Sequence, residues 1–115
     1  MTEEIRYWLM KSEPDAYSLK DLKNEKITLW DGIRNYQARN FMREMNIRDQ
    51  AFFYHSNCSS PGIIGLMEVT RKEIVDPTQF DINSKYYDPK SSQGSPRWDC
   101  VELKYLGQFT NYLTL

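Results

Sequence analysis

The segment Trp30–Asn40 reads WDGIRNYQARN and joins a predicted strand to the clearest helix of the sequence. The residues Ile27–Trp30 favour a short strand because they are largely β-branched or aromatic. The Asp31-Gly32 pair that follows is typical of a tight turn. Apolar side chains then recur at helical spacing over positions 35–45, with Asn35 as a suitable N-cap. The segment therefore predicts a strand, a turn and a helix whose free backbone N–H groups favour an anion.

In the rest of the chain, the sequence predicts more short strands than helices. A second short helix is predicted over Leu19–Asn24, because Ser18 is a suitable N-cap and Asp21 places an acid in the first turn. Gly65 predicts a bulge or a close approach of backbone within its strand. Since the strands do not alternate with regular helices, we expect an α+β domain with a small, mostly antiparallel barrel and short flanking helices. The predicted strands are Ile5–Met10, Gln50–His55, Ile63–Val75, Trp98–Tyr105 and a β-like run over Leu113–Leu115.

The composition is that of one globular domain over residues 1–115. Hydrophobic residues make up 40% of the chain and aromatic residues 14%, enough to build a core. The net charge of −1 excludes a polycation that binds nucleic acid by bulk charge. Any anionic partner must therefore meet a local basic patch or a shaped pocket.

Several kinds of site are excluded by what the sequence lacks. The two cysteines, Cys58 and Cys100, form no C-x-x-C pair, and His55 is the single histidine. We therefore expect no metal site and no cofactor. The start Met1–Arg6 is no signal peptide, and no apolar run is long enough to cross a membrane. A cytoplasmic protein is predicted, or a nuclear one in a eukaryote.

A local excess of positive charge lies on the predicted helix. Between positions 34 and 48 there are four arginines and one glutamate, a local charge of +3. One interpretation is contact with phosphate groups through Arg34 and Arg39. The other is a solvated helix face beside a tryptophan of the core.

The polar segment Asp81–Arg97 carries the adjacent aromatic residues Tyr86 and Tyr87. Long excursions in small domains are usually functional or disordered. One tyrosine can form a pocket wall that stacks on a planar base, and Lys85 and Lys90 can contact phosphates. Alternatively, the tyrosines pin the loop onto the sheet.

Polar residues also follow two predicted strands. Lys11, Ser12 and Glu13 come after the first strand, and His55 and Ser56 close the aromatic strand. These groups suit hydrogen bonding to a ligand edge. A catalytic role for His55 or Glu13 needs a matching nucleophile or second acid, which no motif supplies. The third possibility is that His55 is structural, with its hydrogen bonds made to other groups of the protein.

Five segments in order resemble the EVE domain family of the PUA-like superfamily. The resemblance runs from about Arg6 to Leu115, and five ordered motifs are far more specific than any one of them. It implies a PUA-like barrel with flanking helices, and a chain 1–115 that lacks the C-terminal part of the family's domain. The segments are Tyr7–Pro14 (YWLMKSEP), Trp30–Asn40 (WDGIRNYQARN), Phe53–Asn57 (FYHSN), Pro61–Gly65 (PGIIG) and Lys85–Ser91 (KYYDPKS).

The resemblance further implies a non-enzymatic domain that reads a modified base, with a methylated base expected, in DNA or RNA through an aromatic pocket. Alternatives are an enzyme acting on a nucleotide or modified base with His55 as acid or base, and a protein-interaction module. The oligomeric state stays open. The implied base-pocket residues are Trp30, Tyr87, Tyr86, Ser12, Asn35, His55 and Ser56. The residues implied to contact the nucleic-acid backbone are Lys11, Arg34, Arg39 and Lys90.

Overall fold

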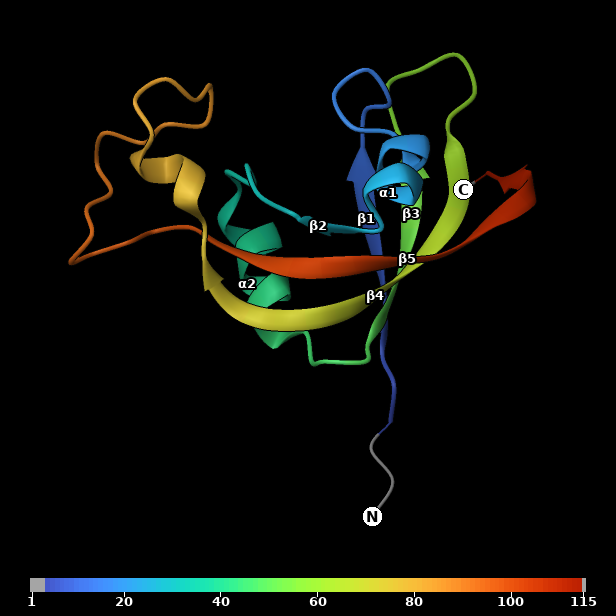
Figure 1. The fold of residues 1–115 in the computed structure, drawn as a ribbon, viewed down its shortest axis with the longest axis horizontal. Helices are drawn as coiled ribbons and strands as arrows, with labels where there is room; N and C mark the ends of the chain where they lie inside the picture. The colour runs from blue at the N-terminus through green and yellow to red at the C-terminus, as the bar shows by residue number, and fades with distance from the viewer. Residues whose placement is uncertain (1–3, 115) are drawn as a thin grey trace.

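The computed structural model describes residues 4–114, which form a mixed sheet with two α-helices (Figure 1). Helix α1 is closed at its start by the predicted capping box, in which Ser18 and Asp21 exchange hydrogen bonds. Asn35 caps α2, and its side chain accepts a hydrogen bond from the Ala38 backbone at 3.0 Å. The elements in order are β1 (Tyr7–Ser12), α1 (Leu19–Glu25), β2 (Ile27–Leu29), α2 (Tyr36–Glu44), β3 (Gln50–His55), β4 (Gly62–Val75), the 3-10 helix η1 (Pro77–Phe80) and β5 (Asp99–Leu113).

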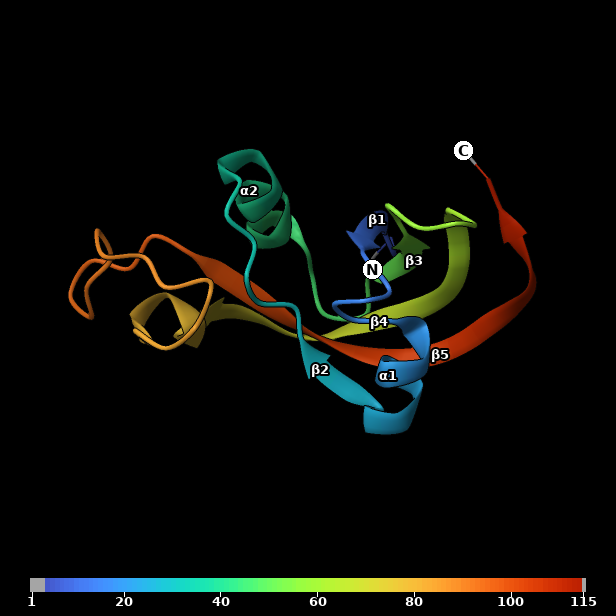
Figure 2. The same ribbon diagram turned by 90° about the horizontal axis from the view of Figure 1, so that it is seen from above.

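The predicted α+β class, with a mostly antiparallel sheet and short flanking helices, is confirmed; the sheet has the strand order β1-β3-β4-β5-β2 and is not closed. β1 pairs with β3 in parallel, and the other neighbours are antiparallel. The long strands β4 and β5 cross the molecule, with β1, β3 and α2 on one side and β2 and α1 on the other (Figure 2). Closure would require β1 and β2 to pair, but they form the two edges of the sheet.

β5 corrects one expectation, since it is one strand of 15 residues rather than a strand followed by a separate run at Leu113. The glycine and polar residues after Tyr105 interrupt the sequence pattern. Pairing with β4 carries the strand through them, with register shifts that absorb the curvature. Leu115 lies outside the described residues.

Gly65 is a place of close approach, as predicted. A Cβ atom there would lie 2.6 Å from the side chain of Leu19 and 2.9 Å from the carbonyl oxygen of Gly107. The β4–β5 register also shifts between Ile63 and Gly65. Glycine therefore lets the start of α1 pack directly on the sheet, and it positions the turn that leads to β2.

The core is centred on two aromatic rings, Trp30 and Phe53. Their centroids lie 5.3 Å apart at 84°, an edge-to-face contact. Phe53 is fully buried, and Trp30 is 8% exposed. Met42 of α2 and Leu22 of α1 belong to the same core. The turn after β2 is thus anchored by a buried indole.

The segment Asp81–Arg97 is tied down at both ends by the buried side chain of Gln79. Its Nε2 donates to the carbonyl oxygens of Asp76 and Trp98 at 2.7 and 2.8 Å. Its Oε1 accepts from the backbone N–H groups of Arg97 and Trp98 at 2.9 and 3.1 Å. The excursion is therefore a lobe closed at its base (Figure 1).

Candidate functional site

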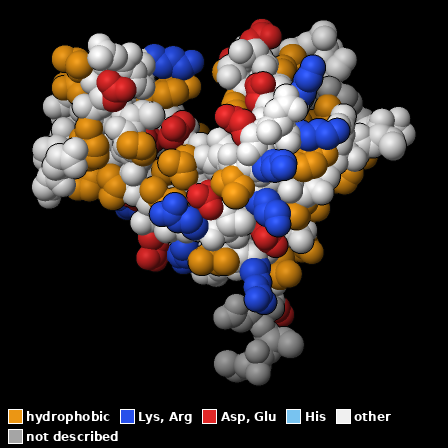
Figure 3. Space-filling model, in the orientation of Figure 1, with side chains coloured by type: hydrophobic (Ala, Val, Ile, Leu, Met, Phe, Trp, Pro, Cys, Tyr) orange, Lys and Arg blue, Asp and Glu red, His pale blue; other side chains and the backbone are white. Residues whose placement is uncertain are grey.

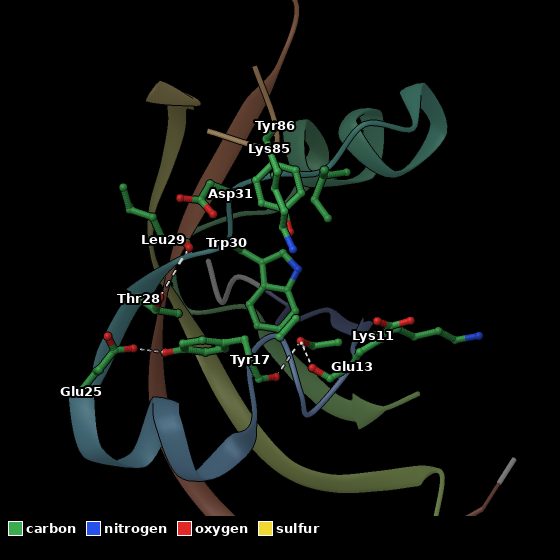
Figure 4. Close-up of a pocket in the computed structure, with 14 residues that line it drawn as sticks. Lys11, Glu13, Tyr17, Glu25, Thr28, Leu29, Trp30, Asp31, Lys85 and Tyr86 are labelled. Carbon is green, nitrogen blue, oxygen red and sulfur yellow. Dashed lines mark hydrogen bonds between the residues drawn. The ribbon is translucent and has the colours of Figure 1, made fainter. Parts of the chain in front are cut away.

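A cavity of about 530 Å³ lies where the end of β1, the turn after β2 and the loop lobe meet. Figure 3 shows the surface notched between the loop lobe and the ends of the strands. Figure 4 draws the lining side chains. They are Lys11, Ser12, Glu13, Ala16, Tyr17, Glu25, Thr28, Leu29, Trp30, Asp31, Gly32, Ile33, Lys85 and Tyr86.

Trp30 is the fixed wall of this cavity. Its backbone N–H donates to the carbonyl oxygen of Val101 at 2.8 Å, which continues the pairing of β2 with β5. The edge of the Tyr17 ring lies against it, with centroids 6.4 Å apart at 87°. A wall held by backbone pairing and core packing stays in place without a ligand.

Tyr86 is a second aromatic wall, and it lies directly on Gly32. Gly32 has a φ of 78°, and a Cβ atom there would lie 2.6 Å from the Tyr86 ring. Only glycine therefore combines this turn with this contact. Of the two predicted loop tyrosines, Tyr86 lines the cavity, whereas Tyr87 is 39% exposed and is not among the lining residues.

Arg34 points inward instead of presenting its guanidinium group to solvent. Its Nε and Nη2 donate to the carbonyl oxygen of Tyr86 at 3.0 and 2.7 Å. Nη1 pairs with the Asp76 carboxylate at 3.1 Å, and Nη2 also donates to Thr78 at 3.0 Å. The side chain is 23% exposed. It joins the turn, η1 and the loop lobe.

The Asp76 carboxylate is the buried centre of this junction. It accepts from the backbone of Gly32 at 2.8 Å and from the backbone and hydroxyl of Thr78 at 2.7 and 2.6 Å. Burial alone would raise the pKa of Asp76. Hydrogen bonds from Thr78, Gly32 and Arg34 outweigh burial and hold the pKa below its ordinary value.

Ser12 and Lys11 reach the cavity from the end of β1. The Ser12 hydroxyl donates to the carbonyl oxygen of Tyr17 at 2.7 Å, which leaves its lone pairs to accept from a ligand. Lys11 is exposed, with its ammonium group 5.3 Å from the centre of the Tyr54 ring. These two predicted residues thus face the same space as Trp30 and Tyr86.

The structure does not bring His55, Ser56 or Asn35 to the lining. His55 is 7% exposed, and its Nε2 accepts from the first N–H of α1, at Leu19, over 3.1 Å. Burial lowers the pKa of His55. Ser56 pairs through its N–H with the Ser12 carbonyl oxygen at 3.0 Å. His55 therefore holds a helix start onto the sheet.

The other two predicted backbone contacts, Arg39 and Lys90, also lie outside the lining. Arg39 donates to the carbonyl oxygen of Arg97 at 2.8 Å, and its guanidinium lies 4.6 Å from the centre of the Tyr36 ring. The Tyr36 ring stacks in turn on Trp98, with centroids 4.7 Å apart. Lys90 is exposed in the loop lobe.

Several lining residues were not predicted as site residues, among them Asp31, Tyr17 and Thr28. Asp31 was interpreted only as the first residue of a turn. The signal available in the sequence was its position directly after Trp30. The pKa of Asp31 is raised, first by burial and then by the charge of Asp76, against a smaller opposing effect of Arg34.

A smaller cavity of about 290 Å³ lies between β1 and α2, on apolar side chains that include Trp8, Phe41 and Met42. It shares Lys11, Trp30 and Ile33 with the larger one. Trp30 therefore borders both cavities.

Residues 4–114 contain neither a side-chain cluster suited to a metal ion nor a helix suited to crossing a membrane. No three His, Cys, Asp or Glu side chains there lie close enough together to hold a metal ion. None of the helices in the same part of the chain has the length and apolar character needed to span a membrane.

Comparison with known proteins points to one family. The family model of the EVE domain matches residues 6–115. Human thymocyte nuclear protein 1 is 43% identical over 120 residues, which cover 95% of this chain and 53% of that protein. The chain spans about half the length of the curated relatives it matches.

Solved structures agree with this likeness. A hypothetical protein from Leishmania major superposes with a TM-score of 0.94 at 46% identity, covering 97% of this chain and 71% of that one. The human THYN1 protein in complex with 5-methylcytosine-containing DNA gives a TM-score of 0.91 at 43% identity, with coverages of 95% and 70%. The α+β fold is thus shared with these proteins.

Proposed function

This chain belongs to the EVE domain family, and on that premise we propose that it binds nucleic acid carrying a modified base and holds the base in the cavity beside Trp30 and Tyr86. The complex of the human relative with 5-methylcytosine-containing DNA supports the class of ligand. It makes DNA with a methylated cytosine the first ligand to test. The protein acts by binding, without a chemical step.

The single observation that carries the proposal is a cavity with two aromatic walls on independent supports. Trp30 is fixed by the core and Tyr86 by Arg34 and Gly32. Stacking of a base on an aromatic side chain is worth about 1–3 kcal/mol. Because both walls are ordered before binding, no conformational entropy is lost in ordering them when the base binds.

The entry of a base into this cavity requires that it leave its stack. Flipping a base from a duplex costs a few kcal/mol, and a base in a single strand costs less. One buried methyl group adds about 0.8 kcal/mol. Discrimination of a methylated from an unmodified base is therefore expected to be modest, about fourfold from the methyl group alone.

Phosphate contacts come from lysines at the mouth of the cavity. Lys11 and Lys85 are both exposed and line it from opposite sides, one on β1 and one on the loop lobe. We assign the backbone contacts to these two residues, because Arg34 and Arg39 are occupied by protein groups. With a net charge of −1, nonspecific binding is weak.

A binding panel tests the proposal. Matched DNA and RNA oligomers that carry 5-methylcytosine, cytosine or an abasic residue at one position are titrated with the protein and with Trp30→Phe. We expect the base-containing oligomers to bind more tightly than the abasic one, with 5-methylcytosine best. In Trp30→Phe, which keeps a ring in the core, this preference shrinks. Equal affinity for all oligomers, or none, contradicts the proposal.

A further inference from the structure

We propose that Asp31 reads the exocyclic amino group of the bound base, so that the cavity selects a cytosine-type edge over the oxo edge of thymine or uracil. This inference rests on the proposed function. It names the chemical class of base and the residue that chooses it.

Asp31 is the lining carboxylate that the protein leaves available. Three carboxylates line the cavity. Glu13 accepts from the side-chain amide of Asn57 at 2.8 Å, and Glu25 accepts from the Tyr17 hydroxyl. Within residues 4–114, no other residue donates a hydrogen bond to the Asp31 carboxyl. Its oxygens can therefore accept from a ligand.

The chain places Asp31 in the turn that follows one aromatic wall and contacts the other. Asp31 follows Trp30 directly, and the next residue, Gly32, is the one on which Tyr86 lies. Figure 4 draws Asp31 between Leu29 and Tyr86. A base whose faces meet the two rings turns its polar edge toward the groups beside them, and Asp31 is such a group.

The nearest cation does not neutralise Asp31 by direct pairing. The Arg34 guanidinium forms its ion pair with Asp76 and also donates hydrogen bonds to Tyr86 and Thr78. Asp31 is also partly withdrawn from solvent. Among the described residues, only its own backbone N–H donates to this half-buried carboxylate, which therefore gains more from a ligand N–H group than a solvated carboxylate does.

The chemistry of the two pyrimidine edges is opposite at this point. Cytosine presents an N4 amino group that donates to a carboxylate, a contact that recurs in base recognition. Thymine presents its O4 oxygen, which accepts and therefore repels a carboxylate oxygen. 5-Methylcytosine and thymine share the ring and the 5-methyl group, so shape and apolar contact cannot separate them.

The test compares these two bases in one oligomer. DNA duplexes with 5-methylcytosine or thymine opposite an abasic residue are titrated with the protein, with Asp31→Asn and with the control Glu44→Gln, which removes an exposed carboxylate of α2 outside the cavity lining. The quantity of interest is the ratio of the two affinities. The comparison of this ratio between proteins cancels the cost of flipping each base.

We expect the wild type and Glu44→Gln to favour 5-methylcytosine by about tenfold or more. In Asp31→Asn, whose amide can turn either its oxygen or its nitrogen to the base, the ratio falls close to one. Asp31→Ala, which lacks any acceptor, shows the same loss. An unchanged ratio in folded Asp31 variants, or an equal fall in Glu44→Gln, overturns the assignment of Asp31. Failure of the wild type to bind either duplex overturns the proposed function itself.

Discussion

Arg34 donates two hydrogen bonds to the carbonyl oxygen of Tyr86, from Nε at 3.0 Å and from Nη2 at 2.7 Å. The same guanidinium pairs with the buried Asp76. The arginine thus holds one wall of the cavity from behind. Under the proposed function, Arg34 positions Tyr86 and other cations contact the nucleic acid.

Replacement of Arg34 separates positioning from phosphate contact. Lysine keeps the charge but cannot donate in the same forked geometry, so Arg34→Lys lets Tyr86 move. Affinity for 5-methylcytosine-containing DNA should fall by about tenfold, while the slope of log affinity against log salt stays unchanged. Lys85→Ala should show the reverse pattern, with a slope smaller by about 1. The slopes are measured by titrating the DNA at several salt concentrations. A reduced slope for Arg34→Lys would show that Arg34 contacts the phosphates.

Gly32→Ala is expected to disturb the same wall. The new Cβ atom would lie 2.6 Å from the Tyr86 ring, at a φ of 78°. The backbone alone costs about 1–3 kcal/mol in such a conformation. Thermal unfolding should show this loss, together with weaker DNA binding. Gly94→Ala is the control, because nothing lies within 4 Å of a Cβ atom there; an equal effect of both substitutions would contradict the account.

The contribution of the Asp76 carboxylate to the stability of the fold depends on pH. Its folded pKa lies below its unfolded value, so its contribution to stability is present above the unfolded pKa and is lost as pH falls through the folded pKa. Asp76→Asn should destabilise the protein by about 3 kcal/mol at neutral pH, because Arg34 loses its partner. The difference in free energy of unfolding between the two proteins should shrink in acid. A constant difference across this range would show that the carboxylate charge plays no part.

The sequence predicted well the features that local patterns determine. β3 and the N-caps Ser18 and Asn35 follow from alternation and from capping chemistry. The open sheet and the single long β5 depend on pairing between distant strands, which no local pattern reports.

The residues of the candidate site could be predicted only where the helix or strand that carries a side chain also determines where that side chain points. Ser12 lines the cavity because it stands at the end of β1. Arg34 carries the same charge whether it faces solvent or the protein, and its partner Asp76 lies 42 positions away. The choice of Tyr86 over Tyr87 is likewise made by the contact with Gly32.

The preference between 5-methylcytosine and thymine should itself depend on pH. The pKa of Asp31 is raised by burial and by Asp76, so it loses its charge at higher pH than an ordinary aspartate. A protonated carboxyl can donate to O4 of thymine, and the preference therefore falls as pH decreases. Asp31→Asn should give a low ratio at every pH. The other charged groups facing this site are Asp76, Arg34, Lys11, Lys85, Glu13 and Glu25.

The two adjacent tyrosines of the loop offer the most direct measurement of the central claim, that a base stacks beside Trp30 and Tyr86. Tyr86 lines the cavity and Tyr87 does not, although both belong to the same lobe. Affinities of Tyr86→Ala and Tyr87→Ala for 5-methylcytosine-containing DNA are compared with those for an abasic oligomer. The account predicts that Tyr86→Ala loses about tenfold in affinity for the methylated DNA alone, and that Tyr87→Ala binds as the wild type does. Equal losses in both variants, or a loss confined to Tyr87→Ala, would contradict it.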